Sequence, residues 1–383
     1  MARLTSIELF SGAGGLALGL HAAGFRHQAL FEWNASAVDT LLYNQRMKHP
    51  SLKGCKISRA DVRDVDFTPY VGVDLVAGGP PCQPFSMGGK AAGMNDARDM
   101  FPQAIRAVAE VQPKAFIFEN VRGLLRPAFA NYVEYIMLQM EFPTFPISQN
   151  ISWDQNLRRL QRHKESVGET AKDLHYRVHK HQVNSADFGI PQQRHRVFFV
   201  GFRSDIATDW SFPPETHKDP LLLAKAEKKS AIRGLRQASE IYPWRTLGDA
   251  ISDLSSPISK AAKKWHNHIY QAGAKAYPGH TGSPLDRPAK ALKAGDHGVP
   301  GGENMILFPD ESVRYLTVRE SARVQTFPDD YVFLGSWTES MRQLGNAVPK
   351  DLAEIVGKSV FRALSRHASR NSKDSGSEAL QST

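Results

Sequence analysis

Short apolar runs alternate with amphipathic helical patterns through the first half of the chain. The apolar runs predict strands at residues 7–10, 28–31, 73–77, 115–118 and 196–201. The segments between them predict helices at residues 14–23, 35–47 and 101–111. This alternation is typical of βαβ units, so we expect an α/β domain with a mostly parallel sheet.

The pattern changes after about Phe202. Residues 225–236 are basic and polar, and residues 278–300 are dense in glycine and proline, which predicts a loop-rich region. Helical patterns return at residues 318–325 and 351–364, and the Ser-rich end predicts a disordered tail. We therefore divide the chain into four parts, residues 1–204, 205–313, 314–366 and a tail at 367–383.

Charge and cysteine content narrow the function. The net charge of +9 favours a polyanionic partner, most simply nucleic acid. The two cysteines, Cys55 and Cys82, have no metal-binding or disulfide spacing, so we expect no metal and a reducing compartment. The amino terminus does not read as a signal peptide, and no apolar stretch is long enough to cross a membrane. These features point to a cytoplasmic protein with no membrane partner.

The first predicted strand runs through Phe10-Ser11-Gly12-Ala13-Gly14-Gly15 into a helix. Glycines at such a turn let a ligand approach the backbone and the helix amides. Glu32 ends the second strand, where a carboxylate can bind ribose hydroxyls. Trp33 could stack on an adenine ring, and Asp61 could accept from its amino group. These residues suit a dinucleotide and S-adenosylmethionine equally well.

One cysteine stands in a rigid loop after a predicted strand. The sequence GGPPCQPFS at residues 78–86 places Cys82 between prolines, which restrict the backbone and aim the thiol. The end of a strand in an α/β sheet is where ligands bind, and a thiolate is a strong nucleophile. Taken alone, this segment is more often a small buried cysteine beside a rigid turn than a reactive one.

Five motifs in order decide between these alternatives. They are FSGAGG at residues 10–15, PPCQPFS at 80–86, Glu119-Asn120-Val121, GIPQQRHR at 189–196 and QLGNAVP at 343–349. In this combination the chain resembles the cytosine-C5 DNA methyltransferases. The resemblance implies S-adenosyl-L-methionine as methyl donor and a class I, Rossmann-like methyltransferase sheet. It also implies a smaller, loop-rich target-recognition domain and a carboxyl-terminal helix beside the cofactor.

The resemblance also implies roles for particular residues. Cys82 matches the nucleophile, Glu119 the acid beside the base, and Arg194 and Arg196 the paired arginines, while residues 88–98 match a loop that closes over DNA. The implied cofactor contacts are Phe10, Ser11, Gly12, Ala13, Gly14, Gly15, Glu32, Trp33, Asp61, Val62, Pro81, Asn346, Ala347 and Val348. Ala291 stands where the family usually carries a threonine that holds a phosphate.

The expected reaction is methyl transfer to C5 of a flipped cytosine through a covalent bond between Cys82 and C6. We expect double-stranded DNA as substrate and a monomeric enzyme at the bacterial nucleoid. The expected role is restriction-modification or orphan modification, and any cognate restriction endonuclease need not be bound. Two alternatives stay open: methylation of tRNA, and a DNA-binding relative with weakened catalysis. His266-Asn267-His268 resembles a nuclease motif, but without a metal cluster it predicts a loop.

Overall fold

The computed structural model describes residues 4–81, 99–167, 173–206, 208–233, 241–294 and 304–381. Its strands are β1 Thr5–Leu9, β2 Arg26–Glu32, β3 Lys56–Arg59, β4 Leu75–Gly78, β5 Ala115–Val121, β6 Tyr176–Asn184, β7 Gln192–Gln193, β8 His195–Arg203, β9 His217–Lys218, β10 Tyr242–Pro243, β11 Ser283–Pro284, β12 Ala289–Lys290, β13 Met305–Leu307 and β14 Val313–Tyr315. Its α-helices are α1 Gly15–Ala23, α2 Ala35–Arg46, α3 Phe101–Val111, α4 Ala130–Glu141, α5 Trp153–Val167, α6 Pro220–Arg233, α7 Leu247–Ile251, α8 Val318–Val324, α9 Trp337–Asn346 and α10 Lys350–Gln381.

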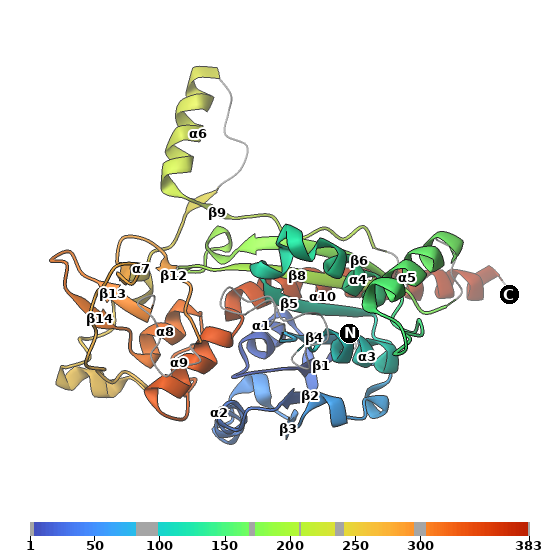
Figure 1. Ribbon diagram of the computed structural model, residues 1–383, viewed down its shortest axis with the longest axis horizontal. Coiled ribbons are helices and arrows are strands. Elements are labelled where there is room, and N and C mark those ends of the chain that lie inside the picture. Colours follow the sequence, from blue (N-terminus) through green and yellow to red (C-terminus); the bar gives the residue numbers. More distant parts are fainter. Residues whose placement is uncertain are drawn as a thin grey trace.

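A seven-stranded sheet forms the centre of the molecule, in the order β3-β2-β1-β4-β5-β8-β6 (Figure 1). The strands from β3 to β5 pair in parallel, while β8 runs antiparallel between β5 and β6. The expected α/β sheet is therefore confirmed. Because β1, β2, β3, β4 and β5 run in the same direction, the segments that follow them emerge at one edge of the sheet.

Alternating residues of the central strands supply two cores, one on each face of the sheet. In β5, Phe116 and Phe118 belong to the core that contains α3 and α4. Ala115 and Ile117 belong to the opposite core, which contains α1 and α10. This is the period of two that a strand buried on both faces requires.

The carboxyl-terminal helix packs against the first helix of the chain at very short range. A Cβ atom on Gly19 of α1 would lie 2.4 Å from the Ala353 side chain and 2.5 Å from the Lys350 carbonyl oxygen of α10. No real Cβ contact is that short, so only glycine permits this approach. The carboxyl-terminal helix α10 therefore packs directly on α1, the helix that connects β1 to β2.

Smaller elements follow the central sheet. The strands β11, β13 and β14 form one small sheet, and β12 pairs with β7 beside the start of β8. Figure 1 shows α6 projecting from the rest of the molecule. A third core joins α1 and α2 to α8, α9 and the segment around Leu292. This core connects the carboxyl-terminal elements to the glycine turn after β1.

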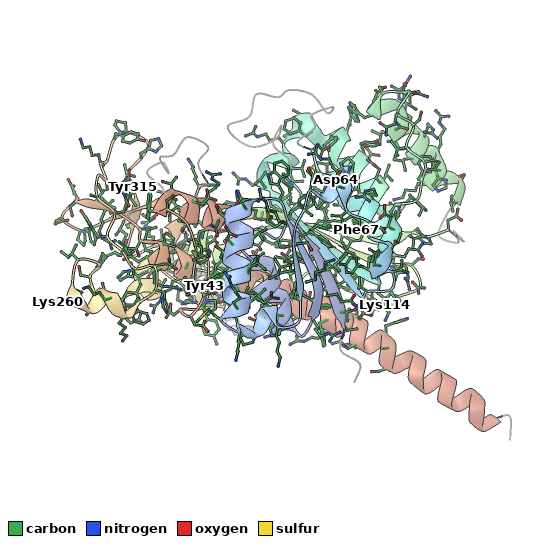
Figure 2. All side chains as sticks on the ribbon, turned by 90° about the horizontal axis from the view of Figure 1, so that it is seen from below. Tyr43, Asp64, Phe67, Lys114, Lys260 and Tyr315 are labelled. Atoms are coloured by element: carbon green, nitrogen blue, oxygen red, sulfur yellow. The ribbon has the colours of Figure 1, made fainter. Side chains whose placement is uncertain are left out.

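The carboxyl-terminal tail corrects one expectation. Residues 367–383 were expected to be disordered, but α10 continues to Gln381, and its distal part extends away from the rest of the molecule (Figure 2). The first turns of α10 are held by the core, and extending an existing helix costs much less than starting one. The apolar pattern ends near Leu364, but the helix does not.

The sequence patterns also missed several elements, among them β6 and α5. In β6, residues 179–182 are all exposed, because this strand lies at the edge of the sheet. In α5 the buried side chains are only Asn156, Leu157 and Leu160. Neither segment carries enough apolar residues to display its periodicity. Among the described residues, no helix is both long and apolar enough to span a membrane.

Replacing Gly19 with alanine tests the contact between α1 and α10. Alanine in a helix interior normally stabilises by about 1 kcal/mol relative to glycine. Here we expect Gly19→Ala to lower the free energy of unfolding by roughly 1–3 kcal/mol, because the added methyl group overpacks the interface. Urea unfolding of the purified protein measures this change. Ala22→Ser, at an exposed position of the same helix, should stay within about 0.5 kcal/mol of the parent. A stabilised Gly19→Ala variant would contradict the packing described.

Candidate active site

The residues singled out in the first half of the sequence converge at the carboxyl-terminal edge of the parallel strands. The glycine turn follows β1, Glu32 ends β2, and Asp61 follows β3. The segment Gly79–Pro81 follows β4, and Glu119 lies near the end of β5. This shared edge is where α/β sheets of this kind bind ligands.

The turn after β1 has a backbone that favours glycine. Gly12 and Gly14 have φ angles of 52° and 92°, and Phe10 between them and the strand also has a positive φ of 56°. The Ser11 amide donates to the Phe31 carbonyl at 3.1 Å, which ties the turn to β2. The turn is therefore held in a strained but defined shape next to the amino terminus of α1.

Glu32 anchors this turn from the end of β2. One carboxylate oxygen accepts from the Gly12 amide at 2.7 Å, and the other accepts from the Asn34 amide at 2.7 Å. Burial raises the pKa of Glu32, while these backbone hydrogen bonds oppose the shift. Two carboxylate oxygens offer about four acceptor positions, so each can accept one further hydrogen bond. Glu32 can therefore shape the turn and still bind a diol.

Trp33 and Asp61 flank Glu32 with different exposure. The Trp33 side chain is 65% exposed, which leaves it free to stack on a planar ligand. Asp61 pairs with Arg63, whose Nε donates to both carboxylate oxygens at 2.9 and 3.0 Å. Hydrogen bonds from Arg63 lower the pKa of Asp61, so this carboxylate acts as an acceptor. The adjacent Val62 is buried.

The turn Asn346–Ala347–Val348 reaches the same place from the far end of the chain. A Cβ atom on Gly15 would lie 2.3 Å from the Val348 carbonyl oxygen, so this turn contacts the start of α1 directly. Asn346 is exposed at the end of α9, while Ala347 and Val348 are buried. The hydroxyl of Tyr331, fully buried, donates to the Ala13 carbonyl at 2.8 Å. Tyr331 was not foreseen, because no sequence pattern linked it to the glycine turn.

The segment before Cys82 is held at several points. The Asn120 side chain donates to the Pro80 carbonyl at 2.9 Å, and the Met100 amide donates to the Pro81 carbonyl at 3.1 Å. Pro80 is buried and Pro81 is exposed. Cys82 and the loop of residues 88–98 lie outside the described residues. The chain that leads to Cys82 is thereby fixed beside β5.

Glu119 and Arg196 form a buried ion pair. Arg196 Nε lies 2.7 Å from Glu119 Oε1, and the two side chains are 14% and 9% exposed. They come from neighbouring antiparallel strands, β5 and β8. The second Glu119 oxygen lies 3.6 Å from the position that a Cβ on Gly79 would take. Burial lowers the pKa of Arg196 and the charge of Glu119 opposes this shift. The structure thus brings an acid and a hydrogen-bond donor to the segment that precedes Cys82.

Arg194 is placed differently from Arg196. Its guanidinium is buried and donates to the Leu292 carbonyl at 3.3 Å and to the Gly345 carbonyl at 2.8 Å. These bonds tie it to the segment after β12 and to the end of α9. The geometry therefore favours a positioning role for Arg194 over the catalytic contact that the sequence motif implied.

Cys55 and His268, which the sequence also offered as reactive side chains, are buried in surroundings that suit a structural role. The buried Cys55 thiol has a pKa raised to about 12 by desolvation, so it is unreactive at neutral pH. His268 is buried between the Thr317 hydroxyl at 2.9 Å and the Ser255 carbonyl at 2.7 Å, in a segment without helix or strand. Within the described ranges, no cluster of His, Cys, Asp or Glu side chains is arranged to hold a metal ion.

Glu8 is a buried carboxyl group that the sequence motifs did not single out for a role. It lies in β1, one residue before the strand's end, and its Oε2 has no hydrogen-bond partner among the described residues. Desolvation raises its pKa well above the usual range, and the charge of Glu32 raises it further. A raised pKa favours the neutral carboxyl group, which avoids a second buried negative charge next to Glu32.

Comparison with known proteins gives a consistent result along almost the whole chain. Residues 4–152 and 155–362 match the family model described as C-5 cytosine-specific DNA methylase. The chain is 33% identical over 366 residues to type II methyltransferase M.NgoMIV of Neisseria gonorrhoeae, covering 95% of this chain and 99% of that protein. It is 32% identical over 376 residues to type II methyltransferase M.AplI of Arthrospira platensis, covering 96% and 88%.

Solved structures share the fold at lower identity. A prophage-encoded candidate DNA modification methyltransferase of Escherichia coli superimposes with a TM-score of 0.61 at 20% identity, covering 94% of this chain and 99% of that one. DNMT2 of Spodoptera frugiperda superimposes with a TM-score of 0.55 at 15% identity, with the same coverage. These likenesses establish the fold and leave the substrate to other evidence.

The buried carboxyl of Glu8 predicts a pH dependence. A raised native pKa means that the folded protein binds a proton that the unfolded chain releases above about pH 4.3, so stability falls as pH rises toward the native pKa. For one such group the slope approaches about 1.4 kcal/mol per pH unit. We expect Glu8→Gln to make the free energy of unfolding fall less steeply between pH 5 and 8. Glu165→Gln, at an exposed position of α5, should leave the slope unchanged. Equal slopes in parent and Glu8→Gln would show that Glu8 is ionised in the folded protein.

Proposed function

Because this chain belongs to the C-5 cytosine-specific DNA methylase family and is a DNA (cytosine-5-)-methyltransferase, we propose that it methylates a flipped cytosine in duplex DNA through Cys82. The observation that carries this mechanism is the Glu119–Arg196 pair beside the anchored segment Gly79–Pro81. The carboxylate of Glu119, the guanidinium of Arg196 and the segment that leads to Cys82 therefore lie together at the carboxyl-terminal end of the parallel strands.

The glycine turn and its neighbours fit the methyl donor that the family implies. S-adenosyl-L-methionine supplies a methyl group on a positively charged sulfur. Glu32 has acceptor positions left for the ribose hydroxyls, and the exposed Trp33 offers a stacking surface for adenine. Asp61 offers a carboxylate for the adenine amino group. The exposed Asn346 and the turn Ala347–Val348 complete the binding site from the side of α9.

The chemistry of cytosine explains the need for the remaining groups. C5 is a poor nucleophile, so the Cys82 thiolate adds to C6 and pushes an electron pair toward the ring. Glu119 binds the N3 and N4 edge and stabilises the proton taken up there, while Arg196 donates to O2. C5 then takes the methyl group, loses its proton to a base or water, and the thiolate leaves by elimination. A base inside a duplex is inaccessible, which requires flipping.

We propose that residues 205–313 choose the DNA sequence and that residues 1–204 and 314–366 perform the chemistry. The isolated helix α6 and the short strands β9 to β13 suit a region built from loops. The position of Ala291 fits this division. Ala291 directly follows β12, and β12 pairs with β7, the strand that ends just before Arg194. The half-buried Ala291 thus lies near the paired arginines, where a phosphate contact is expected.

We further propose a restriction-modification or an orphan modification role, in which any cognate restriction endonuclease need not be bound and the enzyme acts as a monomer on bacterial DNA. The full-length similarity to type II methyltransferases of bacteria supports this role. The match to a DNA methylase family supports duplex DNA over tRNA as substrate.

Bisulfite sequencing of DNA from bacteria that express the chain tests the proposal directly. We expect 5-methylcytosine at one short sequence, absent from cells with the empty vector. Purified protein assayed with labelled methyl donor on duplex DNA and on tRNA separates the two substrates. Methylation of tRNA alone, or of neither, would overturn the proposal.

The two cysteines provide a matched test of the covalent step. We expect Cys82→Ala to abolish methyl transfer while DNA and cofactor affinity stay within about threefold, because only the covalent step needs the thiol. Duplex DNA with 5-fluorocytosine at the target should form a denaturation-resistant adduct with the parent and none with Cys82→Ala, since fluorine blocks elimination.

Cys55→Ala is the control for this pair, because the Cys55 thiol is buried and unreactive. It should keep both turnover and adduct formation once its folding has been checked by circular dichroism. Measurable turnover by Cys82→Ala would rule out the proposed mechanism.

A further inference from the structure

Three buried polar side chains join parts of the molecule that are far apart in sequence. Gln192 in β7, Arg194 after it and Gln325 after α8 are each no more than 1% exposed. Gln192 Nε2 donates to Gln325 Oε1 at 3.2 Å. We call these three side chains the buried polar cluster.

One side of the cluster holds the turn assigned to the cofactor. Gln325 Nε2 donates to the Ala347 carbonyl at 3.1 Å and also to the Leu344 carbonyl. Arg194 Nη2 donates to the Gly345 carbonyl at 2.8 Å. These carbonyl groups belong to the last turn of α9 and to its C-cap residue. Carbonyl groups at a helix end have no hydrogen-bond donors within the helix, and the negative end of the helix dipole favours a positively charged donor. The cluster therefore fixes the turn that carries Asn346.

The other side holds the segment after β12. Gln192 Oε1 accepts from the Leu292 amide at 3.4 Å, and Arg194 Nη1 donates to the Leu292 carbonyl at 3.3 Å. Gly345 also meets this segment, because a Cβ there would lie 2.5 Å from the Ala294 amide nitrogen. The segment includes Ala291, the position proposed to lie near the target phosphate. Both peptide groups of Leu292 are thus bound by the cluster.

The cluster makes the two segments depend on each other. Each amide in it donates on one side and accepts on the other, so a shift of either segment leaves a buried polar atom without a partner. A buried polar atom without a partner is costly, which favours joint movement of the two segments over separate movement. Apolar packing at the same place would tolerate small independent shifts.

We propose that Gln192, Arg194 and Gln325 are positioning residues that couple binding of the methyl donor to binding of the target DNA. This inference rests on the proposed function, since it assigns the two segments to those ligands. A shift of the turn at Asn346 on cofactor binding would move the segment at Ala291 with it, and DNA binding would do the reverse. By linkage each ligand must then tighten the other by the same factor.

The experiment measures that factor in the full-length protein. S-adenosylhomocysteine serves as the cofactor probe, and the DNA probe is a fluorescent duplex with the sequence identified by bisulfite sequencing. DNA affinity is measured by anisotropy with and without a saturating concentration of S-adenosylhomocysteine. We expect the parent to bind DNA about fivefold or more tightly with the cofactor probe present.

The variants Gln325→Met and Gln192→Met keep side-chain length and lose the hydrogen bonds. In each variant, we expect S-adenosylhomocysteine to change DNA affinity by less than about twofold. The double variant should show no further loss of this coupling. Gln192→Met lies on the other side of the hydrogen bond, so it tests the proposal if Gln325→Met fails to fold.

Gln343→Met is the matched control. Gln343 is a buried glutamine of α9 whose amide bonds to Thr40 at 2.8 Å and to the Leu334 carbonyl at 3.0 Å, away from the cluster. It should keep the coupling factor of the parent even if its stability falls. Loss of coupling in Gln343→Met, or its full retention in Gln325→Met or Gln192→Met, would overturn the inference.

The outcome for the parent separates the two proposals. A parent that methylates DNA and binds both probes without coupling overturns the inference and leaves the function standing. A parent that binds neither probe and methylates no DNA overturns the function, and the inference falls with it.

Discussion

The approach of α10 to α1 is the contact on which the rest of the site depends. Gly15 and Gly19 present bare backbone to residues 347–354, and no side chain fits between the two segments. This brings the turn at Asn346 to the glycine turn after β1. The proposed cofactor site is consequently built from both ends of the chain, and it can form only after the whole chain has folded back on itself.

Burial of charged groups is the second feature of this edge of the sheet. Glu8 and Glu32 lie on neighbouring strands, and burial raises the pKa of both. Two backbone amides compensate the charge of Glu32, whereas burial and the neighbouring Glu32 raise the pKa of Glu8 and so favour its neutral form. At the other end, Glu119 and Arg196 compensate each other directly. The proposed site for a sulfonium and a base with shifting charge therefore has its own charges fixed in advance.

The two arginines of the QQRHR motif show how one short motif serves two purposes. They are separated by one residue, and only Arg196 contacts Glu119. Arg194 instead binds backbone carbonyls from the segment after β12 and from α9. The sequence motif marked both arginines as important and could not divide their roles, because the partners of Arg194 are carbonyl groups that every residue carries.

The sequence by itself determined the α/β sheet, the order of its first strands and the family of the chain. Alternating apolar runs are local signals, and motifs such as FSGAGG and PPCQPFS span only a few consecutive residues. It also placed Glu32, Asp61 and Glu119 at strand ends, and the direction of parallel strands brought them together. The role of Cys82 stays a prediction, since this residue lies outside the described part of the chain.

Only the tertiary structure decided the rest. The contact of Tyr331 with Ala13, the cluster around Gln325 and the raised pKa of Glu8 all depend on residues far apart in sequence. The edge strand β6 lacked an apolar pattern, because most of its residues are exposed to solvent. Apolar periodicity reports burial, and it carries no information on which distant backbone group a polar side chain will bind.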